Sequence, residues 1–245
     1  MISKEEQRGD LHVVIVTDTG VSHRLSNRPN QDAVLYSFME EDFVLAVSDG
    51  VGSCPKAEIG SKAAVAAASN VFKAIKSNAC NLEDIQVDFI AEWKQLLSDE
   101  LLDDCCATLK VAMKFGNKLI LMSLGDGMLV VTSNGFKVGS PSDGMLFANQ
   151  TRCLSSFVKP ADIWIKEVHL DLRVPYVVFM CTDGIANGLK DGSEYELVRE
   201  IEENTPSEKL KEELELLVVD ISDFSSDDRT LGVVKYEWEN AEPKR

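Results

Sequence analysis

Three apolar segments of the sequence end in the same dipeptide, Asp-Gly: FVLAVSDG, LILMSLGDG and YVVFMCTDG. They place Asp49, Asp126 and Asp183 directly after stretches with the composition of buried strands. Asp-Gly is also a favoured pair in tight turns, because glycine adopts positive φ without strain. One such pair would therefore indicate only a turn, whereas three pairs suggest that the aspartates contribute to a common site.

Further aspartates stand where other strand-like segments begin. Asp32 precedes AVLYSF, and Asp227 and Asp228 precede the final segment, TLGVVKY. If these strands share one core, the carboxylates gather at one end of it, where they repel one another and resist desolvation. Hard divalent cations such as Mg²⁺ and Mn²⁺ prefer oxygen ligands and compensate such a cluster. The pattern therefore predicts a divalent metal site.

The elements that position these aspartates are short strands rich in β-branched and aromatic residues. The sequence predicts strands over residues 11–17, 33–38, 43–48, 107–115, 118–124, 128–133, 163–170, 176–182 and 230–236. Helical spacing of apolar residues predicts helices over 57–77, 82–105, 194–203 and 206–222. Strands and helices come in groups rather than alternating singly. This order favours an α+β domain with helices covering sheet faces over a doubly wound parallel sheet.

Length and composition limit how many domains the chain can form and which classes of partner it can bind. The 245 residues, 44% of them hydrophobic, are enough for one core. We expect one domain over residues 9–237, with frayed termini at 1–8 and 238–245. The net charge of −16 argues against a nucleic-acid or anionic-membrane partner. The sequence shows neither a signal peptide nor an apolar run of about 18 residues, which predicts a cytoplasmic protein. Its six cysteines lack zinc-type spacing, and we interpret them as reduced thiols.

Five motifs carry a family resemblance: NRPNQDAV, AVSDGVGS, SLGDGMLV, CTDGIANGL and DDRTLGVV. Their order and spacing over residues 11–236 resemble the metal-dependent serine/threonine phosphatases of the protein phosphatase 2C (PPM) family. The Gly-Ser that ends the second motif is similar to that of a bacterial subgroup. The resemblance implies a four-layer α-β-β-α sandwich, with two antiparallel sheets around a binuclear metal site and helices outside.

The resemblance also implies roles for the aspartates. Asp49 would bridge two ions of Mn²⁺ or Mg²⁺, and the Gly50 carbonyl would bind one of them. Asp183 and Asp227 would hold the other ion. Asp228 stands where the family has Asn, which leaves open which of the two neighbours is a ligand.

Two further aspartates match the family less directly. Asp32 resembles the residue that contacts the metal site through water. Asp126 matches the aspartate of a Gly-Asp-Ser-Arg motif that helps to bind a third ion, but Gly127 and Met128 replace its Ser and Arg. A simple turn is an equally good interpretation of Asp126.

The implied reaction is hydrolysis of phosphoserine or phosphothreonine by direct attack of a metal-bridging hydroxide, without a phosphoenzyme. The implied partners are a phosphoprotein substrate and a cognate serine/threonine kinase, and we expect a monomer. Two alternatives remain. A pseudophosphatase or regulatory module would share the fold with a degenerate metal site. A nucleotide-binding protein is disfavoured because GVGSCPKAEIG fits no glycine-rich phosphate-binding motif.

Phosphate binding and acid catalysis are less well determined. The family's phosphate-binding Arg corresponds to Asn27, flanked by Arg24 and Arg28, and either could contact phosphate. His23 is a candidate general acid toward the leaving oxygen, although a local structural role is the simpler interpretation. Residues 139–162 stand where the family carries a flap, and we interpret them as the element that screens protein substrates.

Overall fold

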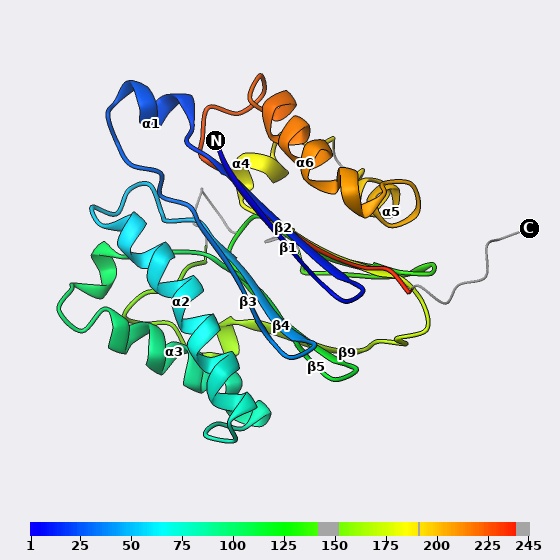
Figure 1. Ribbon diagram of the computed structural model, residues 1–245. Helices are drawn as coiled ribbons and strands as arrows, with labels where there is room; N and C mark the ends of the chain where they lie inside the picture. The colour runs from blue at the N-terminus through cyan, green and yellow to red at the C-terminus, as the bar shows by residue number, and fades with distance from the viewer. Residues whose placement is uncertain (142–151, 191, 239–245) are drawn as a thin grey trace, which may run out of the picture.

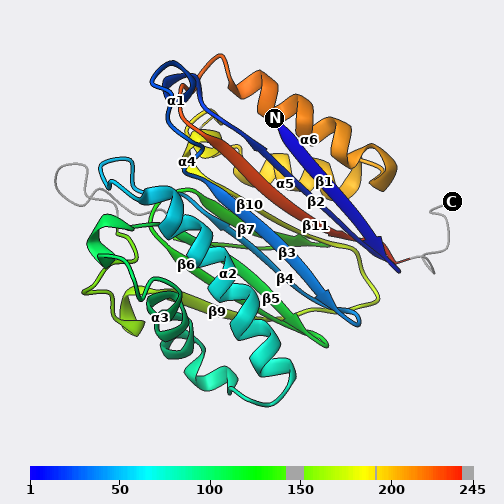
Figure 2. The same ribbon diagram turned by 60° about the vertical axis from the view of Figure 1, so that its left-hand side comes forward.

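The computed structural model describes residues 1–141, 152–190 and 192–238. Two antiparallel sheets face each other, and helices cover the outer face of each sheet (Figures 1 and 2). The order of layers is helix, sheet, sheet, helix. The predicted α+β four-layer sandwich is therefore confirmed.

The six-stranded sheet contains the first and the last strand of the fold. Its order is β1, β2, β11, β10, β7, β8, and each neighbouring pair is antiparallel. The strands are β1 (Ile2–Arg8), β2 (Leu11–Asp18), β11 (Arg229–Tyr236), β10 (Tyr176–Cys181), β7 (Met128–Ser133) and β8 (Phe136–Gly139). The inner four are apolar, as expected for strands covered on both faces.

The five-stranded sheet is a meander extended by one late strand. Its order is β3, β4, β5, β6, β9, again with antiparallel neighbours. The strands are β3 (Ala33–Met39), β4 (Asp42–Ser48), β5 (Leu109–Phe115), β6 (Lys118–Leu124) and β9 (Trp164–His169). Side chains of both sheets, such as Leu45 and Val178, form the layer between them.

Helices close the two outer faces. The five-stranded sheet is covered by α2 (Ala57–Lys76) and α3 (Ile85–Leu96), and the six-stranded sheet by α5 (Glu194–Glu203) and α6 (Ser207–Ile221). Two short helices, α1 (Val21–Leu25) and α4 (Asp183–Ala186), lie in the loops at one end of the sandwich (Figure 1). Single 3-10 turns are η1 (Leu82–Asp84), η2 (Leu102–Asp104) and η3 (Pro160–Asp162).

The N-terminus differs from the expectation. Residues 1–8 were predicted to be frayed, but Ile2–Arg8 form β1, which pairs with β2 over seven residues. The strand is exposed along most of its length, so backbone pairing rather than burial holds it in place. The expected helix over 82–105 is also shorter, since α3 ends at Leu96. Of the predicted C-terminal tail, residues 239–245 lie outside the described residues.

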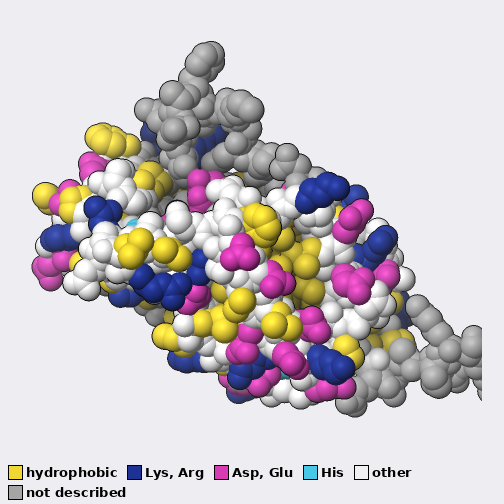
Figure 3. All heavy atoms as spheres, turned by 90° about the horizontal axis from the view of Figure 1, so that it is seen from above, with side chains coloured by type: hydrophobic (Ala, Val, Ile, Leu, Met, Phe, Trp, Pro, Cys, Tyr) yellow, Lys and Arg dark blue, Asp and Glu magenta, His cyan; other side chains and the backbone are white. Residues whose placement is uncertain are grey.

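The surface over α6 is mixed. Hydrophobic side chains lie among acidic and basic ones on this face (Figure 3), and Leu216, Val219 and Phe224 on or just after α6 are exposed. Among the helices of the described residues, none has both the length and the apolar character needed to cross a bilayer.

Candidate metal centre

Antiparallel pairing in the five-stranded sheet brings two of the predicted aspartates together. Ser48, the last residue of β4, is opposite Ala33, the first residue of β3. Asp49 directly follows one of these residues and Asp32 directly precedes the other. The two carboxylates therefore leave the same end of the sheet side by side.

The six-stranded sheet supplies its aspartates at the corresponding place. Cys181, at the end of β10, is opposite Leu231 near the start of β11. Asp183 therefore lies close to Asp227 and Asp228, which precede β11. Both sheets deliver carboxylates to one end of the sandwich.

The glycines after these aspartates have a physical reason. A Cβ added to Gly184 would lie 1.9 Å from the carbonyl oxygen of Asp228, and one added to Gly50 would lie 2.5 Å from the carbonyl oxygen of Ala57. Neither position leaves room for a side chain. Gly127 has two such reasons, because a Cβ added there would lie 2.5 Å from the carbonyl oxygen of Cys181 and its φ of +79° favours glycine.

The electrostatics are those of a crowded carboxylate cluster. Burial raises the pKa of Asp32 to about 7, although the Thr182 hydroxyl donates to its Oδ2 at 2.8 Å. Burial, and then the charges of Asp32 and Asp183, raise the pKa of Asp49 well above its usual value. Burial and the charge of Asp126 raise the pKa of Asp183 to about 6. The protein therefore disfavours the fully ionised cluster at neutral pH.

The residues present fit a divalent cation. Oδ1 of Asp32 is buried and accepts no hydrogen bond from any described donor. Among the described residues, no lysine or arginine forms an ion pair with Asp32, Asp49 or Asp183. Oxygen donors without a compensating cation are what Mg²⁺ and Mn²⁺ require.

The structure distinguishes Asp227 from Asp228. Asp228 is almost fully buried, and its carboxylate accepts hydrogen bonds from Gly20 N–H, His23 Nδ1 and Gln31 N–H, each at 2.7 Å. It thus ties together the loops that precede β3 and β11. Asp227 is exposed, and its charge contributes to the raised pKa values of Asp49 and Asp183. The charge of Asp228 also raises the pKa of Asp32, so both carboxylates lie near the cluster, but that of Asp228 is already bound by three donors.

His23 lies at the edge of the same cluster. It belongs to α1 and is buried, and one of its ring nitrogens and one oxygen each of Asp227 and Asp228 lie within 4.8 Å of one another. Because a carboxylate can only accept, Nδ1 donates to Asp228, which leaves Nε2 as the nitrogen available for proton transfer.

The two candidate arginines have different surroundings. Arg24 donates to Asp18 Oδ2 at 3.1 Å, and the buried Arg229 binds the same oxygen. Arg28 forms no ion pair with a described residue. It lines a cavity of about 270 Å³ together with Gly52 and Ser53, which follow Asp49 and Gly50.

Asp126 occupies the turn between β6 and β7, and the effect of its charge on Asp183 places the two carboxylates close together. Lys110 supports this turn from β5. The lysine is almost fully buried, and its Nζ donates to Gly125 O at 2.7 Å and to Ser123 Oγ at 2.9 Å. The turn is therefore held by a buried cation.

Sequence reasoning missed three supporting residues. They are Lys110, Thr182, and Thr108, whose Oγ1 accepts a hydrogen bond from Asp49 N–H at 2.9 Å. A lysine within the apolar run ATLKVAMKF was the available signal for Lys110. The sequence carries no such signal for the two threonines, because threonine is common in strands.

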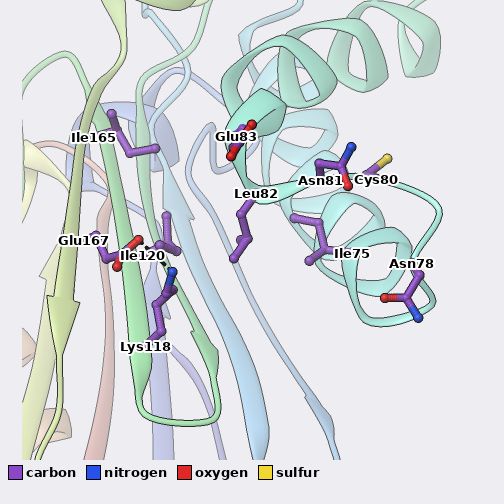
Figure 4. Close-up of a pocket in the computed structure, with 10 residues that line it drawn as sticks. All are labelled: Ile75, Asn78, Cys80, Asn81, Leu82, Glu83, Lys118, Ile120, Ile165 and Glu167. Carbon is purple, nitrogen blue, oxygen red and sulfur yellow. Dashed lines mark ion pairs between the residues drawn. The ribbon is translucent and has the colours of Figure 1, made fainter.

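Two other regions contribute nothing to the centre as described. A cavity of about 830 Å³ between the end of α2 and β6 is lined by Ile75, Leu82 and Ile120, with the ion pair Lys118–Glu167 at its rim (Figure 4). None of the predicted site residues lines it. Part of the predicted flap over residues 139–162, namely residues 142–151, lies outside the described residues.

Both the sequence and the fold of the chain are similar to those of known proteins. Residues 19–217 match the family model described as protein phosphatase 2C. No curated protein matches the chain. Among solved structures, RsbX in complex with magnesium has a TM-score of 0.61 at 14% identity, covering 96% of this chain and 100% of that one. The catalytic domain of the serine/threonine phosphatase PstP with two manganese ions has a TM-score of 0.65 at 19% identity, covering 93% and 99%. PppA of Pseudomonas aeruginosa has a TM-score of 0.68 at 16% identity, covering 93% and 98%.

Proposed function

Since the chain belongs to the protein phosphatase 2C family, we propose that it is a metal-dependent phosphatase of phosphoserine and phosphothreonine in proteins. The observation that carries the proposal is the cluster formed by Asp32, Asp49 and Asp183, whose pKa values are raised and which lacks a basic partner among the described residues. A degenerate site would have lost these carboxylates.

We further propose that Asp49, the Gly50 carbonyl, Asp183 and Asp227 hold two ions of Mn²⁺ or Mg²⁺. Asp32 would orient water at the site, and Asp126 would help to hold a third ion. The ions, when bound, supply a water of lowered pKa and positive charge for the phosphoryl oxygens. The chain supplies the positions of the carboxylates and the exclusion of bulk water around Asp32.

The test is phosphate release from p-nitrophenyl phosphate and a phosphothreonine peptide, measured with chelator and then with excess Mn²⁺. We expect no release with chelator and restored release with Mn²⁺. Release that survives chelation would contradict the metal-dependent reaction. No release with any divalent ion would point to a regulatory module of the same fold.

Arg28 is the arginine that we expect to bind the phosphate, because Arg24 is engaged by Asp18. The Arg28→Ala protein should show a KM for phosphopeptide raised about tenfold, with a smaller change in kcat, since a charge-assisted contact to a phosphate oxygen is lost. Arg24→Ala is the matched control and should leave KM within about twofold. Equal effects of the two substitutions on KM would refute the assignment.

His23 is proposed as the general acid that protonates the leaving serine or threonine oxygen. The His23→Gln protein should hydrolyse a phosphoserine peptide about 10²-fold more slowly, because an alkoxide leaves poorly without a proton. p-Nitrophenolate needs no proton to leave, so p-nitrophenyl phosphate should lose far less activity. A structural role for His23 would instead slow both substrates alike.

The biological setting follows from the reaction. A phosphoserine or phosphothreonine substrate has to be produced by a protein kinase, and we propose that a serine/threonine kinase acts on the same substrate in the cytoplasm. We also propose that the phosphatase acts as a monomer with a single domain. Light scattering of the purified protein would reveal a larger species if this is wrong.

A further inference from the structure

A second cavity lies beside the carboxylate cluster. Its volume is about 420 Å³, and it opens between the start of β7, the end of β8 and the helices α4 and α5. Asp126, Met128, Asn187, Glu194 and Tyr195 are among the residues that line it. The volume is sufficient for one long side chain.

Two residues that line the cavity, Asp126 and Asn187, also neighbour Asp183 of the carboxylate cluster. The Asn187 Nδ2 group donates to Asp183 Oδ2 at 3.4 Å, and the charge of Asp126 raises the pKa of Asp183. The cavity that Arg28 lines also borders the cluster, through Gly52 and Ser53 in the segment that follows Asp49. A peptide whose phosphoryl group is held by cations bound at the carboxylate cluster would therefore have neighbouring residues within reach of this second cavity.

The lining combines an apolar wall with an acidic group. Met128, Ala186 and the ring of Tyr195 provide apolar surface, whereas the Leu129 side chain is buried in the layer between the sheets. Glu194 is half-buried in the first turn of α5 and forms no ion pair with a described residue. Lys137 Nζ lies over the Tyr195 ring, 4.5 Å from its centroid, and Lys137 lines a separate cavity on the side of β8.

Lysine and arginine match this lining, because they have an apolar stem and a cationic head. We propose that the cavity binds a lysine or arginine side chain close in sequence to the phosphorylated residue of the substrate, with Glu194 as the residue that determines this specificity. The proposal rests on the proposed phosphatase function. It adds a substrate class, a phosphopeptide with a neighbouring basic residue.

The test compares phosphothreonine peptides that carry Lys, Ala or Glu at each position within four residues of the phosphothreonine. For the wild-type protein with Mn²⁺, we expect kcat/KM to be about fivefold higher with Lys than with Ala at one or two positions. In the Glu194→Gln protein this ratio should fall below about twofold. Glu196→Gln is the matched control, because it removes the same charge from an exposed site on the same helix outside the cavity. It should keep the fivefold ratio.

A binding measurement separates this proposal from the phosphatase function itself. Fluorescence anisotropy of labelled Lys and Ala peptides that carry a non-hydrolysable phosphonate in place of the phosphate, measured in Mn²⁺, reports the same preference without turnover. Equal affinity for the two peptides, or an equal loss of preference in the Glu194→Gln and Glu196→Gln proteins, would overturn the proposal. A preference for Lys that depends on Glu194 but without phosphate release would uphold it and count against the phosphatase function alone.

Discussion

The Asp49→Asn protein is expected to release phosphate at least about 10³-fold more slowly than the wild type, with either substrate and excess Mn²⁺. Burial, and then the charges of Asp32 from one sheet and of Asp183 and Asp227 from the other, raise the pKa of Asp49. The amide removes the negative charge that we propose to bridge the two ions. Initial rates over a range of Mn²⁺ concentrations, with calorimetry of Mn²⁺ binding, measure both effects.

Asp42→Asn is the matched control, because Asp42 begins the strand that Asp49 follows. Asp42 accepts hydrogen bonds from Lys76 Nζ and Gly116 N–H, each at 2.7 Å, at the opposite end of β4. Its substitution should cost about 1–3 kcal/mol of unfolding free energy and leave kcat within about twofold. The Asp49→Asn protein, in contrast, should unfold at higher urea in chelator. Full activity of Asp49→Asn, or Mn²⁺ binding equal to that of the wild type, would contradict the proposed centre.

The chelated protein is expected to lose stability as the pH rises from about 5 to 8. The folded-state pKa values of Asp32 and Asp183 are about 7 and about 6, both above the values of an unfolded chain. The folded state therefore binds more protons than the unfolded state in this range, so raising the pH favours unfolding. At about 1.4 kcal/mol per pKa unit, the loss from Asp32 alone between pH 5 and its folded pKa of about 7 is about 3 kcal/mol.

Urea unfolding at pH 5.5 and pH 8, in chelator and in Mn²⁺, measures this effect. Mn²⁺ at pH 8 should restore the stability in proportion to the logarithm of its concentration. Asp18 and Asp171 have lowered pKa values, and the stability that they contribute is lost only at lower pH, so they do not mask the trend. A chelated protein that is equally stable at both pH values would show that the carboxylates do not form a strained cluster.

Most strands could be predicted from the sequence because they are apolar and end in turn residues. β1 could not, because ISKEEQR has no apolar face, and the strand depends on pairing with β2. α1 and α4 are too short to show a period, and their positions depend on distant contacts such as Ser22 N–H to Ser226 O at 3.0 Å. Tertiary contacts determine these elements.

Prediction of the candidate site from the sequence is limited in the same way as prediction of the fold. The positions of Asp49 and Asp183 follow from the strands that precede them. The sequence left Asp227 and Asp228 as equivalent neighbours, and only the three donors around Asp228 distinguish them. Likewise, Arg24 and Arg28 are alike in sequence, but Asp18, six residues before Arg24, binds only the first. Such choices depend on hydrogen bonds between segments far apart in the chain or on local loop geometry.

The origin of the carboxylates has a mechanical consequence. Asp49 extends from the five-stranded sheet, whereas Asp183 and Asp227 extend from the six-stranded sheet. A cation held between them would cross-link the two sheets of the sandwich. The cross-link would lie at the end of the sandwich where the loops begin. Metal binding would then resist the separation of the two sheets. The same metal contacts would support both the hydrolysis and the stability of the sandwich.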